Sequence, residues 1–284
     1  MININQHITK HYKRSTLQRL AFAGVLLSLL YRWWAHSLMG QLAAPVLVYP
    51  YVDLTYWTLH LMNIPQWISG NYIVAILFDV LLVGAALGSF VFTEKRIFPI
   101  LFTFLYLIYF VSYNSFGAHH THCMVGVLLI GVPFWFRSEK TFELLWEGLR
   151  YFTLWVYSSA FLWKLLRGSW FNFEQGVAIF MNENATHIAL NPDAWMNGVY
   201  AFFVAHPTLS FLANFGAVLM EGLFIIGFFT KKYDWAWVIL PIIFHTMTYL
   251  FVHVMFYELL ILSLVFLPIS QLTGLNSVNH SVEP

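Results

Sequence analysis

The chain has 284 residues, of which 60% are apolar and only 10% are charged. Soluble domains carry about 25% charged residues, so this composition excludes an ordinary soluble protein and predicts an all-α integral membrane protein. The formal net charge is +1, without a broad basic face, and nucleic acid is therefore not expected as a partner. The single cysteine, Cys123, excludes an intrachain disulfide and a zinc site made of several thiolates.

Eight apolar runs predict about eight transmembrane helices, because a hydrocarbon core of about 30 Å takes about 20 apolar residues per helix. In chain order they cover about 20 to 38, 72 to 92, 97 to 117, 122 to 136, 151 to 168, 208 to 229, 235 to 251 and 254 to 270. We expect one membrane domain over 1–284, embedded from about 20 to 270, and no soluble domain. The first run lacks a small-residue cleavage site, so we interpret it as a span rather than a signal peptide.

The basic side chains predict a multi-pass protein of the cell membrane with cytoplasmic amino and carboxyl termini. Three of the 14 basic residues, Arg32, Lys164 and Arg167, lie inside spans near their outer ends. The others fall in the amino-terminal tail or in cytoplasmic turns: Lys10, Lys13, Arg14, Arg19, Lys95, Arg96, Arg137, Lys140, Arg150, Lys231 and Lys232.

Two long segments between spans, 39–71 and 169–207, are rich in aromatic residues, proline or asparagine. Tryptophan and tyrosine favour the headgroup level of a bilayer. Both segments are therefore expected to form interfacial short helices and loops on the extracytoplasmic side, where they could cap a cavity.

Ionised groups inside a bilayer cost roughly 2.5–3.5 kcal/mol each, so each needs a reason to be there. With alternating span directions, Arg32, Asp79, Lys164, Arg167 and His245 all come out in the middle or outer half of the membrane. We expect them to line a polar pocket that opens to the outside. Three alternatives remain: Arg32 and Asp79 form a structural ion pair, Lys164 extends its ammonium to the headgroups, and His245 is a core histidine.

The two glutamates in the later spans are placed less well. Glu221 comes out nearer the cytoplasmic half, and Glu258 lies near the outer start of the eighth span.

Histidines also gather where the third span meets the fourth, at His119, His120 and His122. They could hydrogen-bond a substrate, pack at the interface, or hold a metal with His187 or His245. Because paired metal-binding spacing such as H-E-x-x-H is missing, no metal is predicted.

Three stretches resemble the transmembrane part of vitamin K-dependent gamma-carboxylase and the wider HTTM family. The first is the sequence VYSSAFLWKL over 156–165, followed by Trp170. The second is FHTM over 244–247, running on to Tyr257 and Pro268, and the third runs from Asn114 through His120 and His122 to Gly126.

The resemblance implies an enzyme that uses a reduced, vitamin K-like quinone and dioxygen to remove a proton from carbon, to which carbon dioxide then adds. Lys164 matches the catalytic base, and His245 and either His120 or His122 match functional histidines. Arg32, Asp79, Arg167 and Trp170 are expected around the cofactor. The first step needs a neutral amine, which a poorly solvated pocket favours.

The sequence departs from this family in two places. The spacing from Lys164 to Trp170 is one residue longer, and an ungapped match puts Thr121 at the family's histidine. The large extracytoplasmic domain of the carboxylase has no counterpart, so a separate substrate or redox protein is a possible partner besides membrane lipid and quinone. The alternative function is a noncatalytic protein that binds quinone or lipid, or a small-solute transporter.

Overall fold

The structure is a computed structural model that describes residues 13–42, 54–114, 124–252 and 256–267. Every regular element in these ranges is a helix, which confirms the predicted all-α class. The predicted spans correspond to α1 (Arg14–Trp34), α4 (Tyr72–Val91), α5 (Ile97–Asn114), α6 (Met124–Ile130) with η4 (Val132–Trp135), α7 (Glu139–Leu166), α10 (Pro207–Leu223) with η5 (Phe224–Phe228), α11 (Asp234–Val252) and α12 (Tyr257–Leu262) with η6 (Ser263–Phe266).

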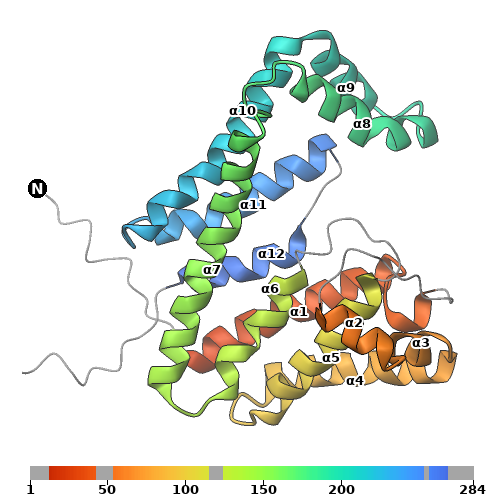
Figure 1. The fold of residues 1–284 in the computed structure, drawn as a ribbon, viewed down its shortest axis with the longest axis vertical. Helices are drawn as coiled ribbons and strands as arrows, with labels where there is room; N and C mark the ends of the chain where they lie inside the picture. The colour runs from red at the N-terminus through yellow and green to blue at the C-terminus, as the bar shows by residue number, and fades with distance from the viewer. Residues whose placement is uncertain (1–12, 43–53, 115–123, 253–255, 268–284) are drawn as a thin grey trace, which may run out of the picture.

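The two segments predicted to contain short helices do contain them. The first holds η2 (Met39–Gln41), α2 (Leu54–Leu61) and α3 (Ile64–Ser69), and the second holds α8 (Gln175–Leu190) and α9 (Met196–Ala205). In Figure 1, α8 and α9 lie together at the top of the molecule, whereas α2 and α3 lie at the lower right.

Among the described residues, three helices are long and apolar enough to cross a bilayer, which supports membrane localisation: Tyr72–Val91, Pro207–Phe228 and Asp234–Val252. In α4, Ala75, Phe78 and Leu82 are buried at helical spacing, while Ile73, Leu77 and others on the opposite face are exposed. Exposed apolar side chains along a whole helix face fit contact with lipid better than contact with water.

Side-chain hydrogen bonds cap the amino ends of two helices, and a left-handed residue follows the carboxyl end of a third. Asn71 caps α4, because its side-chain oxygen accepts hydrogen bonds from the backbone N–H groups of Ile73 and Val74 at 3.0 and 3.3 Å. Ser138 caps α7 in the same way by accepting from the Thr141 N–H at 3.3 Å. After the carboxyl end of α1, His36 has a left-handed backbone with φ of 52°, which turns the chain away from the helix axis.

The prediction was wrong about where α7 begins. This helix starts at Glu139 rather than near 151, and Arg150 lies inside it instead of in a turn. Phe142, Trp146 and Leu149 are buried along its first half, at the spacing of one helix face. The Arg150 side chain is only 2% exposed.

The long helix α7 runs past two groups of helices (Figure 1). In the lower group, α4 packs against α1 and α5, and α12 packs against α6. In the upper group, α10 packs against the second half of α7 and against α8. At one point α8 and α10 are so close that a side chain on Gly176 would collide with the backbone of Ser210.

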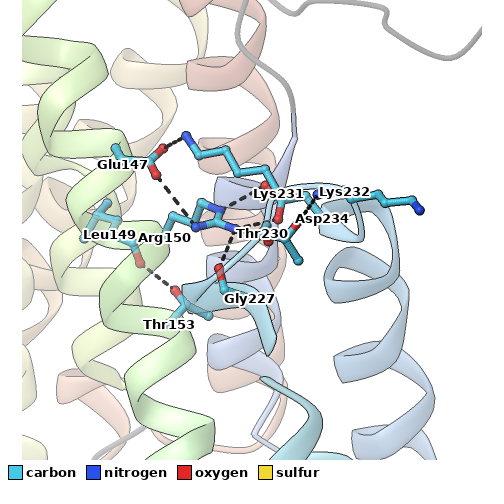
Figure 2. Close-up of polar contacts among 9 residues, drawn as sticks. All are labelled: Glu147, Leu149, Arg150, Thr153, Gly227, Thr230, Lys231, Lys232 and Asp234. Atoms are coloured by element: carbon cyan, nitrogen blue, oxygen red, sulfur yellow. Dashed lines mark hydrogen bonds and ion pairs between the residues drawn. The ribbon is translucent and has the colours of Figure 1, made fainter. Parts of the chain in front are cut away.

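Arg150 fixes the turn between η5 and α11 to α7 (Figure 2). Its guanidinium donates to Asp234 at 2.9 and 2.7 Å, and to the carbonyl oxygens of Gly227 and Thr230 at 3.0 and 3.3 Å. These carbonyls lie at the end of η5, where helical partners run out. Lys231, on the outside of the same turn, pairs with Glu147 at 2.7 Å.

Arg14 binds η4 in the same way as Arg150 binds η5. Its guanidinium donates to the carbonyl oxygens of Phe134 and Phe136 and pairs with Glu139 at 3.2 Å. Two arginines thus each satisfy the free carbonyls of a 3-10 helix and a carboxylate beside it.

Candidate functional site

The site begins on one face of α7. Tyr157, Phe161 and Lys164 are spaced by four and then three residues, so their side chains lie one above another on the helix. Lys164 lies in the last turn of α7, and its side chain is 39% exposed. The opposite wall comes from α10 and η5, which pack against this part of α7.

Lys164 forms a close ion pair with Glu221 of α10. The Lys164 Nζ lies 2.6 Å from each of the two carboxylate oxygens, and the Glu221 side chain is only 8% exposed. A carboxylate with so little access to water needs a cation or a proton, and Lys164 can supply either.

A second polar contact lies deeper along the same face. The Tyr157 hydroxyl lies 2.9 Å from Nε2 of His245, which is 1% exposed on α11. Phe224 stacks on Tyr157, with ring centroids 4.1 Å apart and planes 16° apart. Phe224 follows Glu221 by three residues, so the two side chains lie on one side of the segment formed by α10 and η5. This segment therefore contacts both Lys164 and Tyr157.

Aromatic rings pack around Phe161, which precedes Lys164 by three residues on the same helix face. Trp170 stacks on Phe215 of α10 at 4.7 Å and 20°, and it meets Phe161 of α7 nearly edge-on at 5.3 Å. Trp170 Nε1 and His245 Nδ1 are both buried without a hydrogen-bond partner among the described residues. Two such groups beside flat aromatic surfaces suit a ligand with a ring and polar oxygens.

Arg167 does not join this site. Its side chain is exposed and its guanidinium carbon lies 4.3 Å from the centre of the Trp163 ring. This cation–π contact fits a cation at the membrane surface.

Arg32 belongs to a different buried group. Its Nε donates to Glu258 at 2.6 Å, and its Nη1 donates to the Tyr109 hydroxyl at 3.2 Å. The Tyr106 hydroxyl donates to the same Glu258 oxygen at 3.3 Å. The guanidinium also lies over the Tyr113 ring at 4.6 Å, so α1, α5 and α12 surround one charge pair.

Asp79 is not the partner of Arg32, so the alternative of a structural ion pair between these two residues is wrong. The Asp79 carboxylate instead accepts from the backbone N–H groups of Met39 and Gly40 at 3.1 and 2.7 Å. Its role is to hold η2 against α4.

The two buried polar groups meet at the start of α12. Phe256 packs edge-on against His245, with ring centroids 5.5 Å apart, and Glu258, two residues later, binds Arg32. The five residues predicted to line one pocket are therefore divided. Lys164 and His245 share one buried group, Arg32 lies in the neighbouring group, and Asp79 and Arg167 belong to neither.

Residues 115–123 of the third resembling stretch, with His120 and His122, lie outside the described residues. Within the part of the chain that is described, no three histidine, cysteine or carboxylate side chains come together as a metal site would require.

Three residues of the two buried groups are not among the predicted site residues. Glu221 binds Lys164, Glu258 binds Arg32, and Tyr157 contacts His245. A signal for Tyr157 was present, since it precedes Lys164 by seven residues and so shares its helix face.

No protein-family model, curated protein or solved structure matches this chain. The arrangement itself offers an amine beside a carboxylate that can exchange its proton, a tyrosine–histidine pair, and an aromatic wall.

Proposed function

We propose that the chain is a multi-pass protein of the cell membrane that catalyses carboxylase-like chemistry with a reduced quinone at the Lys164–Glu221 site. The eight helices named above as counterparts of the predicted spans would each cross the membrane, with both termini cytoplasmic. The helices of 39–71 and 169–207 would lie on the extracytoplasmic side. The positions of the basic residues support this orientation.

The observation that carries the proposal is the contact of Lys164 with both oxygens of Glu221. When water leaves the site, the ammonium–carboxylate pair becomes less stable relative to the neutral pair of amine and carboxylic acid. The reason is that desolvation of the two charges costs more free energy than their attraction returns. A substrate that closes the exposed side of Lys164 would therefore drive its proton to Glu221. The neutral amine could then accept a proton from a hydroxyl held against it.

The surrounding side chains fit a quinone. In the resembled HTTM family, the reduced quinone and dioxygen together supply the base that takes a proton from carbon, and the quinone leaves as its epoxide. In this chain, Phe161, Trp170 and Phe215 would hold the ring, and the unpartnered Trp170 Nε1 would donate to an oxygen of the ligand. The pair of Tyr157 and His245 would orient the deeper end.

The test is dioxygen uptake and quinone epoxide formation by the purified protein with a reduced naphthoquinone. We expect turnover in the wild type and in Lys140→Ala, a control on the exposed first turn of the same helix. Lys164→Ala should abolish turnover, and Glu221→Gln should reduce it because the proton acceptor is lost. Unchanged epoxide formation by Lys164→Ala would refute the proposed base.

A noncatalytic role in binding quinone or lipid, or in carrying a small solute, is the second candidate. It is favoured by the same ion pair, since an ammonium held by two carboxylate oxygens can be purely structural. Quinone binding without dioxygen uptake, equal in wild type and Lys164→Ala, would select this candidate.

A further inference from the structure

A second candidate site lies at the opposite end of α7 from Lys164. A partly open cavity of about 650 Å³ lies where the start of α1, the turn between α4 and α5, and the turn between η4 and α7 come together. Phe136 is the one apolar residue among those that line it. Cavities for apolar ligands are lined mostly by hydrophobic side chains, so this cavity suits a small polar group instead.

The charges around the cavity leave an excess of cations. Four basic residues line it, Lys13, Arg14, Arg96 and Arg137, against two acidic ones. Arg14 is neutralised by Glu139 at 3.2 Å. The three other cations face a single remaining carboxylate in the lining, that of Glu94.

Arg14 and Arg96 bind the backbone around the cavity, whereas Lys13 and Arg137 stay available for a ligand. Arg14 and Arg96 donate to backbone carbonyls of η4 and the residues after it, including Trp135 at 3.3 Å from Arg96 Nη1. Within the described residues, the side chains of Lys13 and Arg137 make no hydrogen bond or ion pair. Arginine and lysine beside a preformed cavity are the side chains that bind phosphate oxygens in proteins.

Apolar side chains at the same level indicate where the phosphate comes from. Phe136, in the lining, is exposed, and so are Phe92 and Ile97, which flank the α4–α5 turn. In a protein that lies in a membrane, exposed apolar residues beside a basic cavity fit acyl chains next to a headgroup. A freely dissolved anion would gain nothing from them.

We propose that this cavity binds the headgroup phosphate of an anionic glycerophospholipid, held by Lys13 and Arg137. The assignment rests on the membrane location and is independent of the proposed enzymatic activity. The lipid would be drawn from the leaflet that meets the turns carrying most of the basic residues. It would link α1 to the start of α7 through its headgroup.

The experiment titrates full-length protein, purified in a neutral detergent and stripped of lipid, with phosphatidylglycerol and measures bound lipid by native mass spectrometry. We expect Lys13→Gln combined with Arg137→Gln to weaken binding at least about tenfold, because two charge-assisted contacts are lost. Lys140→Gln is the matched control: it removes a neighbouring exposed charge outside the lining, and its affinity should equal that of the wild type.

Two further arms separate the sources of phosphate. Phosphatidylcholine with the same acyl chains should bind more weakly than phosphatidylglycerol, and millimolar inorganic phosphate should not displace the lipid. Equal binding of both lipids, displacement by inorganic phosphate, or unchanged affinity in the double variant would each overturn the proposal. If the double variant does not fold, Arg137→Gln alone should still weaken binding measurably, and unchanged affinity there would overturn it equally.

Discussion

Replacing Arg150 with methionine should destabilise the protein more than any loss of a surface charge. Arg150 is 2% exposed at its side chain and holds Asp234 through two hydrogen bonds of 2.9 and 2.7 Å. Methionine keeps most of the volume but leaves the carboxylate and the carbonyls of Gly227 and Thr230 without their donor. Breaking a buried pair on one side costs about 3–5 kcal/mol. The Asp234 side chain is 17% exposed, which puts the expected loss near the lower end of that range.

The assay is the free energy of unfolding in mixtures of detergent and sodium dodecyl sulfate. Lys231→Met is the matched control, because it breaks the neighbouring pair with Glu147, in which the lysine side chain is 63% exposed. Such an exposed pair contributes about 0–1 kcal/mol. The double variant Arg150→Met and Asp234→Leu should recover part of the loss, since two apolar side chains replace a buried ion pair while the carbonyls of Gly227 and Thr230 stay without their donor. Equal losses for Arg150→Met and Lys231→Met would show that the buried clamp does not hold the turn.

Three further substitutions, one of them with a control variant, test other parts of the fold by the same unfolding measurement. Glu258→Ala should cost about 3–5 kcal/mol, because it leaves the buried guanidinium of Arg32 without its carboxylate; a loss below 1 kcal/mol would contradict the described pair. Gly176→Ala should cost roughly 1–3 kcal/mol, since α8 and α10 must move apart. Gly198→Ala, where a new side chain meets open space, should cost nothing, and equal values for the two glycines would disprove the close approach. Tyr157→Phe should cost about 1 kcal/mol through its hydrogen bond to buried His245, and an unchanged stability would argue against that bond.

The apolar runs predicted the helices well, but they missed the amphipathic start of α7. The predicted span begins at 151, directly after Arg150, whereas the helix already begins at Glu139 and carries exposed charged side chains, such as that of Lys140, in its first turn. Phe142, Trp146 and Leu149 repeat at helical spacing through this part, so periodicity would have extended the helix to Glu139 where mean hydropathy did not.

The depth of a residue along a predicted span did not predict which residues pair: Glu221, assigned to the cytoplasmic half, pairs with Lys164, assigned to the outer end. Depth says nothing about which helices are neighbours, and the partner of Lys164 depends on α10 packing against α7. For Arg32, the sequence offered Asp79 as a carboxylate at similar depth. The structure satisfies Asp79 with two backbone N–H groups, which become available only because the chain after α1 folds into η2. Glu258 is then the carboxylate that pairs with Arg32.

The pair of Arg32 and Glu258 also bears on the order of events during synthesis, because its members are 226 residues apart. Ribosomes add about 5–20 residues per second, so α1 waits roughly 10–45 s before its carboxylate exists. An arginine left in the hydrocarbon costs roughly 2.5–3.5 kcal/mol even on the insertion scale. Tyr109, made after 77 residues, offers a hydroxyl much sooner. In the proposed eight-span topology, the first helix is therefore expected to stay near the membrane surface or against α5 until α12 is made, so that its contact with α12 forms among the last in the protein.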